Sequence, residues 1–156
     1  MMRGSNRVRT RLAALLGARD GNAAMEFSLA APVLAIIFVP LIDLGMAFYQ
    51  QMQVQDAAQA GAQYAMAHGW NSNSIQSAVT SATALSVSAS PAPSKSCGCP
   101  DGSSVGAATC GSTCSDGQAA GSYVTVSAQA TYTPLLPYPL MGSSVTLSAQ
   151  TTARIQ

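Results

Sequence analysis

The residues best suited to chemistry are four cysteines that fall into two closely spaced pairs: Cys97, Cys99, Cys110 and Cys114. Structural zinc sites favour pairs with about two to four intervening residues, so C-x-C makes a poor zinc knuckle, and no second type of ligand lies near. A redox enzyme would carry C-x-x-C at a helix N-terminus, which this segment lacks. Closing the first pair on itself would strain a very short loop. We therefore expect disulfides that join each of the first two cysteines to one of the last two.

The other candidates for catalysis are too scattered to form a site. His68 is the only histidine, and the acids Asp56, Asp101 and Asp116 show neither nucleophile nor metal-site spacing. Two of these acids precede a glycine, which is typical of turns. We therefore expect no enzymatic activity, no catalytic residue, no cofactor and no metal.

A single acid stands just before the longest apolar segment. Glu26 precedes 23 residues, 27–49, of which only Asp43 is charged at neutral pH. As a helix with a rise of about 1.5 Å per residue, this segment would reach roughly 35 Å, enough for a hydrocarbon core of about 30 Å. It is too long for the apolar core of a cleaved secretory signal. We expect one membrane-spanning helix, kinked or locally unwound at Pro32 and Pro40.

Both acids need a partner or an interface, because an ionisable group is costly inside a membrane. For Glu26 the alternatives are an amine partner or a place at the headgroup level, where it would compensate the helix N-terminus. Asp43 lies 17 residues farther along, near the outer interface. It either extends to that interface or contacts a neighbouring subunit, and the sequence leaves both open.

Positive charge is concentrated at the N-terminus, although the chain carries a formal net charge of only +1, with 8% charged and 48% hydrophobic residues. Five of the seven cations precede the first acid: Arg3, Arg7, Arg9, Arg11 and Arg19. Such an arm could bind phosphates of nucleic acid, but it has no aromatic residue and abuts a membrane-length segment. The positive-inside rule explains it better. We expect a cytoplasmic N-terminus, a periplasmic C-terminal domain and no nucleic-acid partner.

The junction at 21–26 resembles the processing site of type IV prepilins, in which a membrane peptidase cuts after a glycine. The resemblance implies cleavage after Gly21, so that the mature chain begins at Asn22 and Glu26 becomes its fifth residue. It also implies that the Glu26 carboxylate pairs with the N-terminal amine of a neighbouring subunit. Glu26, with Asp43 as a second candidate, would then be an assembly residue.

A longer stretch, 26–65, resembles the module of TadE-like proteins, the minor pilins of tight-adherence pilus systems. The resemblance rests on a Gln-rich turn and on the following residues: Glu26-Phe27, Pro32, Asp43, Gly45, Phe48-Tyr49, Ala57-Ala58, Gly61 and Tyr64-Ala65. Asp43 is a departure, since members of the family usually carry Glu. Residues 123–156 also resemble these proteins, which often end in two strands flanking a Pro-Leu-rich connection. Residues 70–121 match no family that we recognise.

The remaining patterns predict an α+β fold. Apolar residues from Ile75 to Leu85 recur at helical spacing, after cap candidates at 71–74. The Ser/Pro-rich stretch 86–96 predicts an edge strand or a loop. Alternation with a period of two, at 123–132 and from Val145 onwards, predicts strands of a short antiparallel sheet packed on the helices.

Three domains are expected: an Arg-rich leader at 1–21, a long helix at 22–69, and a small extracytoplasmic head at 70–156 with a cysteine-containing loop at 97–114. Five residues should share one apolar face of the long helix: Phe48, Met52, Ala58, Tyr64 and Ala65.

The resemblance implies a minor pilin or pseudopilin that takes part in assembling a tight-adherence or type IV-like pilus or secretion system for surface attachment. Its implied partners are the prepilin peptidase, other pilin or pseudopilin subunits, an inner-membrane assembly platform and membrane lipid. The protein would cross a bacterial inner membrane once, or be incorporated into an extracellular pilus. The alternative is an uncleaved single-pass scaffold or binding module of a secretion apparatus.

Overall fold

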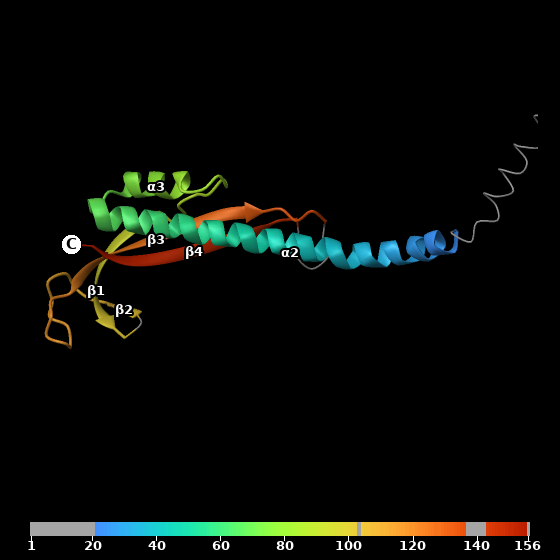
Figure 1. The fold of residues 1–156 in the computed structure, drawn as a ribbon. Helices are drawn as coiled ribbons and strands as arrows, with labels where there is room; N and C mark the ends of the chain where they lie inside the picture. Colours follow the sequence, from blue (N-terminus) through green and yellow to red (C-terminus); the bar gives the residue numbers. More distant parts are fainter. Residues whose placement is uncertain (1–20, 103, 137–142, 156) are drawn as a thin grey trace, which may run out of the picture. The chain divides into compact units, whose positions relative to one another are not determined.

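The computed structural model describes residues 21–102, 104–136 and 143–155 (Figure 1). Their elements, in chain order, are α2 (Gly21–His68), α3 (Ser72–Ser81), β1 (Ser94–Asp101), β2 (Ser104–Ala107), β3 (Gly121–Tyr132) and β4 (Val145–Ile155). The predicted α+β class, with a long helix before a small domain, is confirmed. The predicted leader up to residue 20 and residues 137–142 of the Pro-Leu-rich connection lie outside the described residues.

The chain divides into two compact units, and the division falls within α2, between Ile42 and Asp43. In the first unit, residues 21–42 are helical throughout. The helix continues through Pro32 and Pro40, so neither proline unwinds it. Each proline removes a single backbone donor, and the neighbouring hydrogen bonds are sufficient to keep the segment helical.

The second unit is built on the part of α2 from Asp43 onwards. Its buried hydrophobic helix residues are one valine and four alanines: Val54, Ala57, Ala58, Ala62 and Ala65. The predicted apolar face is right for Ala58 and Ala65. It is wrong for Phe48 and Met52, which are 62% and 56% exposed. The helix thus turns its small residues toward the core and its large ones outward.

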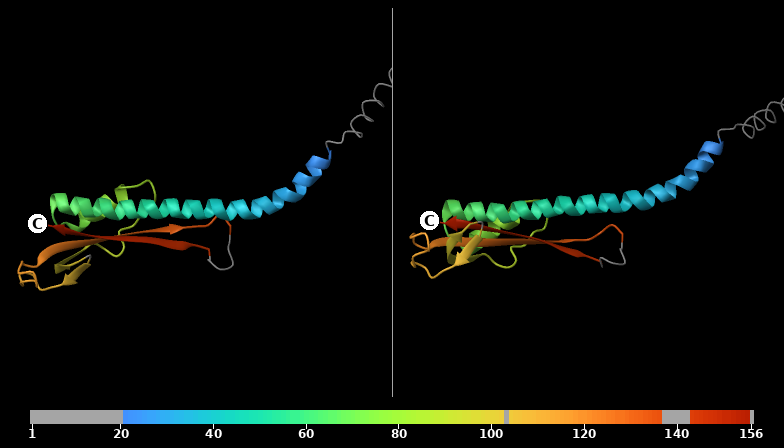
Figure 2. Two further views of the ribbon diagram at one scale, coloured as in Figure 1. Left: turned by 60° about the horizontal axis from the view of Figure 1, so that its bottom comes forward. Right: turned by 90° about the horizontal axis from the view of Figure 1, so that it is seen from below.

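Close packing explains this choice of small residues. A Cβ atom added to Gly61 would lie 2.5 Å from Val79 Cγ2 and 2.9 Å from Val126 Cγ1. Carbon atoms that are not bonded do not approach so closely, so only glycine fits where α2 meets α3 and β3. Both views of Figure 2 show the second half of α2 running beside the orange and red strands β3 and β4.

Helix α3 begins at a cap that its sequence supplies. The Asn71 side chain accepts a hydrogen bond from the backbone N–H of Ser74 at 3.1 Å, which satisfies one of the free donors of the first turn. Ile75 and Val79 point into the core, as their spacing predicts. The helix ends at Ser81, short of the predicted Leu85, after Thr80 and Ser81 side chains bond back to the carbonyl of Ser77. Such local bonds compete with helix continuation.

The sheet has the strand order β2-β1-β3-β4, and every neighbouring pair is antiparallel. The two predicted strands are confirmed as β3 and β4, paired from Ser122 opposite Ile155 to Tyr132 opposite Val145. Val124, Val126, Ala128 and Ala130 are buried, as alternation predicts. The predicted cysteine loop is partly wrong, because Cys97 and Cys99 lie on strand β1.

Candidate assembly site

Glu26 lies in the first unit with its side chain exposed. Its Oε1 accepts a hydrogen bond from Asn22 Nδ2 at 3.3 Å, one helical turn earlier. Residues four apart occupy the same side of a helix. Asn22, the implied first residue of a processed chain, and Glu26 are therefore neighbours on one face of α2.

The surface around Glu26 is apolar on every side of the helix. Between residues 25 and 42, ten large hydrophobic side chains are 46–75% exposed: Met25, Phe27, Leu29, Val33, Leu34, Ile36, Ile37, Phe38, Leu41 and Ile42. A helix that is apolar all round is suited to lipid or to other helices rather than to water. α2 is also long and apolar enough to cross a membrane. The helix of this unit can therefore pack against lipid or other helices on every side.

Asp43, the first residue of the second unit, is only 3% exposed. The hydroxyl of Tyr132 hydrogen-bonds to its carboxylate Oδ1 and lies 2.9 Å from its backbone oxygen. The backbone N–H of Leu135 donates to the same carboxylate oxygen at 3.2 Å. Asp43 thus binds residues that follow it by 89 and 92 positions, and it fastens the end of β3 to the helix.

Sequence reasoning missed this contact, because both interpretations of Asp43 looked for its partner outside the chain. The sequence does contain a signal for this contact. Tyr132 continues the inward-facing series 124, 126, 128 and 130 of the predicted strand, and it brings the only hydroxyl to that series. A buried tyrosine hydroxyl usually finds a hydrogen-bond partner, so a lone acid on the helix is a natural candidate. The proposed assembly role of Asp43 stays a prediction.

The four cysteines form two disulfides, Cys97–Cys110 and Cys99–Cys114, with Cα atoms 5.1 and 5.6 Å apart. This is one of the two cross-pairings that the sequence leaves open. The bonds join β1 to the segment between β2 and β3, which lies outside the strands of the sheet and forms an isolated bridge within itself, between Thr113 and Ala119. Cross-links compensate there for the shortage of buried apolar surface.

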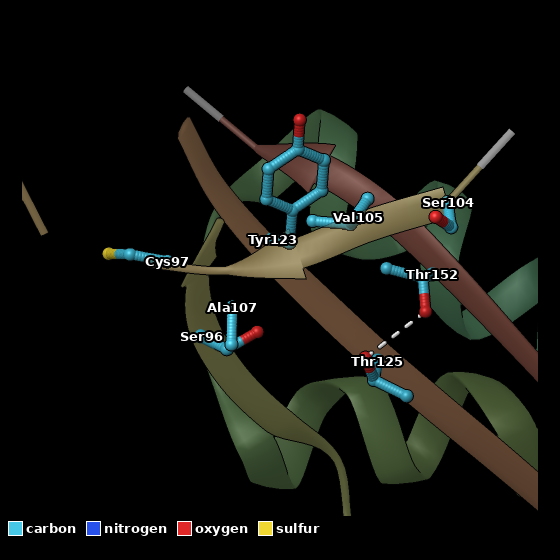
Figure 3. Close-up of a pocket in the computed structure, with 8 residues that line it drawn as sticks. All are labelled: Ser96, Cys97, Ser104, Val105, Ala107, Tyr123, Thr125 and Thr152. Atoms are coloured by element: carbon cyan, nitrogen blue, oxygen red, sulfur yellow. Dashed lines mark hydrogen bonds between the residues drawn. The ribbon is translucent and has the colours of Figure 1, made fainter. Parts of the chain in front are cut away.

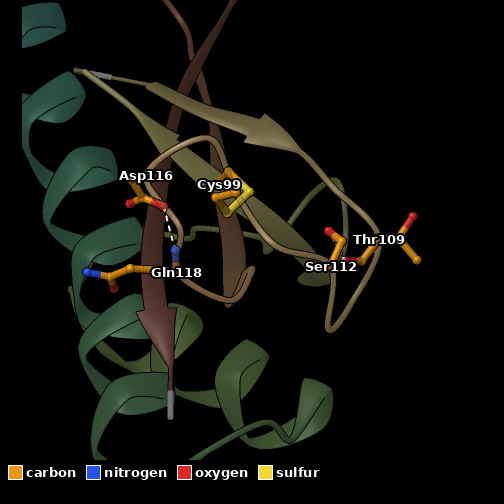
Figure 4. The surroundings of a disulfide bond; sticks show 6 residues. Cys99, Thr109, Ser112, Asp116 and Gln118 are labelled. Atoms are coloured by element: carbon orange, nitrogen blue, oxygen red, sulfur yellow. Dashed lines mark hydrogen bonds between the residues drawn. A yellow bond between two sulfur atoms is a disulfide. The ribbon is translucent and has the colours of Figure 1, made fainter.

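The turns in this segment follow from its acids and glycines. Asp116 Oδ1 accepts a hydrogen bond from the backbone N–H of Gln118 at 2.9 Å (Figure 4). The intervening Gly117 has a φ of 81°, in the left-handed region that favours glycine. Gly102, after Asp101, has a φ of 60°. Both Asp-Gly pairs therefore form the turns that the sequence predicts.

The remaining acids and the histidine stay apart from these contacts. His68 stacks on Tyr64 with ring centroids 4.4 Å apart, at the C-terminal end of α2. Asp56 is exposed on the same helix. Within residues 21–102, 104–136 and 143–155, no three His, Cys, Asp or Glu side chains gather in a way that could hold a metal ion. The expectation that the protein is not an enzyme stays a prediction.

Comparison with known proteins finds a family match for the first part of this chain. Residues 21–63 match the family model described as TadE-like protein. No curated protein and no solved structure matches the chain. The matched segment contains Glu26, Asp43 and Gly61, and it ends before α3 and the sheet. The resemblance to TadE-like proteins that was inferred from the sequence is thus confirmed over residues 21–63.

Proposed function

We propose that this protein is a minor pilin or pseudopilin of a tight-adherence, type IV-like pilus or secretion system. One observation carries the proposal: a TadE-like helix exposes apolar side chains around its whole circumference and bears one carboxylate, Glu26, close to its start. A bilayer and a bundle of like helices are the two environments that suit such a surface. A subunit stored in the membrane and then packed into a filament would use both.

Processing would complete the site. Cleavage after Gly21 creates a free amine on Asn22, a residue whose side chain already contacts Glu26. The new amine would lie on the same helical face as the carboxylate, one turn before it. Glu26 could then pair with its own amine in the membrane and exchange it for the amine of a neighbouring subunit during assembly. An ion pair of either kind lowers the cost of a carboxylate in an apolar environment.

The second unit would form the head of the subunit. Disulfides persist in oxidising compartments, so the two cross-links favour a head outside the cytoplasm, with the Arg-rich leader on the cytoplasmic side. Asp43 would serve assembly indirectly, because its carboxylate is engaged by Tyr132 and Leu135 within the head. Prepilin peptidase, the other subunits and an inner-membrane platform are the proposed partners. We propose a structural role without catalysis.

Replacing Glu26 tests the proposal. Glu26→Gln keeps size and hydrogen bonding but removes the charge, and we expect the fraction of the protein in sheared filaments to fall by about tenfold or more. The amount in the inner membrane should stay unchanged. Immunoblots of sheared and membrane fractions measure both. The matched control is Asp56→Asn, a neutralised exposed acid on the second half of α2, which should assemble normally.

Two results would contradict the proposal. Normal assembly of the Glu26→Gln variant would show that the Glu26 carboxylate is not needed for assembly. If the unaltered protein stays in the membrane fraction of cells that make the pilus, the result would instead favour an uncleaved single-pass scaffold.

A further inference from the structure

The face of the sheet turned away from the helices is lined by hydroxyl and amide side chains. Alternate residues of β3 and β4 stand opposite one another on it. The pairs are Tyr123 with Arg154, Thr125 with Thr152, Ser127 with Gln150, Gln129 with Ser148, and Thr131 with Thr146. Arg154 is the only charged residue of this row, which we term the hydroxyl strip. It extends along β3 from Tyr123 to Thr131, which is roughly 27 Å at a rise of about 3.4 Å per residue.

The hydroxyl strip is hollowed rather than flat. A hollow of about 360 Å³ lies at the Tyr123 end, between the strip and strand β2 (Figure 3). It is lined by Ser96, Cys97, Ser104, Val105, Ala107, Tyr123, Thr125 and Thr152. β2 and β4 are the two edges of the sheet, yet both contribute to this one hollow. The sheet therefore curls, and β2 overhangs the strip.

Two further hollows continue along the same strip. One, of about 260 Å³, includes Ser127, Gln129 and Gln150 in its lining. The next, of about 210 Å³, includes Gln129, Thr131 and Thr146. Because their linings follow the order of residues along β3, the three hollows form a row. A row of this kind fits an extended polymer better than a single small molecule.

The lining fits an uncharged polyol. No charged side chain is among the described residues that line the three hollows. A hydroxyl group donates one hydrogen bond and accepts two, so threonine and serine match the hydroxyls of a sugar in either direction. Thr125 and Thr152 bond to each other at 3.1 Å and keep lone pairs for a ligand. Tyr123 and Val105 both line the first hollow (Figure 3) and add apolar atoms to it for a sugar ring.

Other classes of partner fit less well. An anionic ligand would call for several cations, and the strip has one. A protein interface is typically rich in aromatic residues, methionine and arginine at its centre, whereas the centre of this strip is serine, threonine and glutamine. We propose that the hydroxyl strip binds a neutral polysaccharide chain, laid along β3 and β4 with one end under β2. This site does not depend on the pilin proposal, because binding would occur in an isolated chain.

Calorimetry on the full chain tests the site. The protein is titrated in a sugar-free zwitterionic detergent with four neutral hexasaccharides (cellohexaose, maltohexaose, chitohexaose and mannohexaose) and with acidic hexagalacturonate. We expect at least one neutral probe to bind and hexagalacturonate to bind about tenfold more weakly or not at all. Replacing both Thr125 and Thr152 with valine removes two hydroxyls without changing shape, and it should weaken binding by about tenfold or more. Thr109→Val, an exposed threonine outside the hollows, should bind as the parent does.

A second variant keeps the test informative if the double valine variant misfolds. Gln150→Glu keeps the size of an exposed side chain and adds a negative charge to the middle hollow, and it should also weaken binding of the neutral probe. The proposal is overturned if none of the four neutral probes binds, or if only hexagalacturonate does. It is also overturned if both variants bind like the parent. Light scattering tests one further alternative. If the parent protein is a dimer and the variants are monomers, the strip binds a second copy of this chain and the polysaccharide proposal is overturned.

Discussion

The two halves of α2 have the same secondary structure but opposite surfaces. Residues 22–42 expose their large apolar side chains except Val39, which is half-buried, whereas the half from Asp43 to His68 buries Val54 and four alanines. The first half has no core of its own, so its apolar surface can be covered only by lipid or by other protein. The second half satisfies its apolar face within the chain. A single helix can therefore serve as an assembly element and as the base of a folded domain.

Side-chain size distinguishes the two halves. Leucine, isoleucine and phenylalanine give the first half a large surface that suits lipid or helix packing. Alanine and glycine give the second half a narrow surface that lets a sheet and α3 approach closely. We therefore expect substitutions in the second half to change folding, and substitutions in the first half to change only assembly.

The largest expected effect is at Gly61. Gly61→Val places atoms where Val79 and Val126 already lie, so we expect the free energy of unfolding of the second unit to fall by about 3 kcal/mol. Chemical denaturation of the full chain, followed by the fluorescence of Trp70, measures this quantity. Gly45→Ala is the control, since nothing lies within 4 Å of a Cβ at that position. It should leave the second unit as stable or slightly more stable, because alanine favours a helix over glycine.

A smaller effect is expected at Tyr132. Tyr132→Phe removes the hydroxyl that bonds to Asp43, and we expect a loss of about 2 kcal/mol in the same unfolding experiment, because a buried polar group loses a donor. Tyr49→Phe is the control, as Tyr49 is 61% exposed. Equal stability of the two variants would show that the Asp43 contact does not fasten β3 to the helix.

The smallest effect on folding is expected in the first half. Phe38→Ala should change the free energy of unfolding of the second unit by less than about 0.5 kcal/mol, because Phe38 is exposed and belongs to the other unit. Its effect should appear as a lower fraction of protein in sheared filaments. Val54→Ala, a truncation in the buried face, should do the reverse and cost about 1 to 3 kcal/mol of stability. A large loss of stability in Phe38→Ala would erase the distinction between the two halves.

Local periodicity was enough to predict much of this fold. The long helix, the cap at Asn71 and the strands β3 and β4 follow from apolar spacing and turn residues. The face of α2 from Asp43 onwards was harder to predict. Phe48 and Met52 are the more hydrophobic residues, but Gly61 and the alanines allow the closest approach and therefore decide which side is buried. Hydrophobicity alone does not report how near two elements can come.

Contacts between distant parts of the chain were not predictable in the same way. Asp43 and Tyr132 are 89 residues apart, and only the register of β3 against the helix brings them together. β1 was predicted only in part, because the edge strand or loop expected at 86–96 covers just its first three residues. The residues of β1, Ser94 to Asp101, show little alternation of apolar and polar side chains. The strand instead pairs through its backbone with Gly121 to Thr125, and two disulfides hold its cysteines. Cross-links and backbone pairing, rather than apolar burial, define that strand.

The central claim is that α2 is the processed assembly helix of a pilin-like subunit, and the N-terminal mass of the protein tests it most directly. Intact mass spectrometry is applied to the protein from cells with and without prepilin peptidase, and to a Gly21→Val variant. The account predicts a chain that begins at Asn22 only when the peptidase is present and Gly21 is intact. A chain that keeps Met1, or a mass that is the same with and without the peptidase, would contradict it.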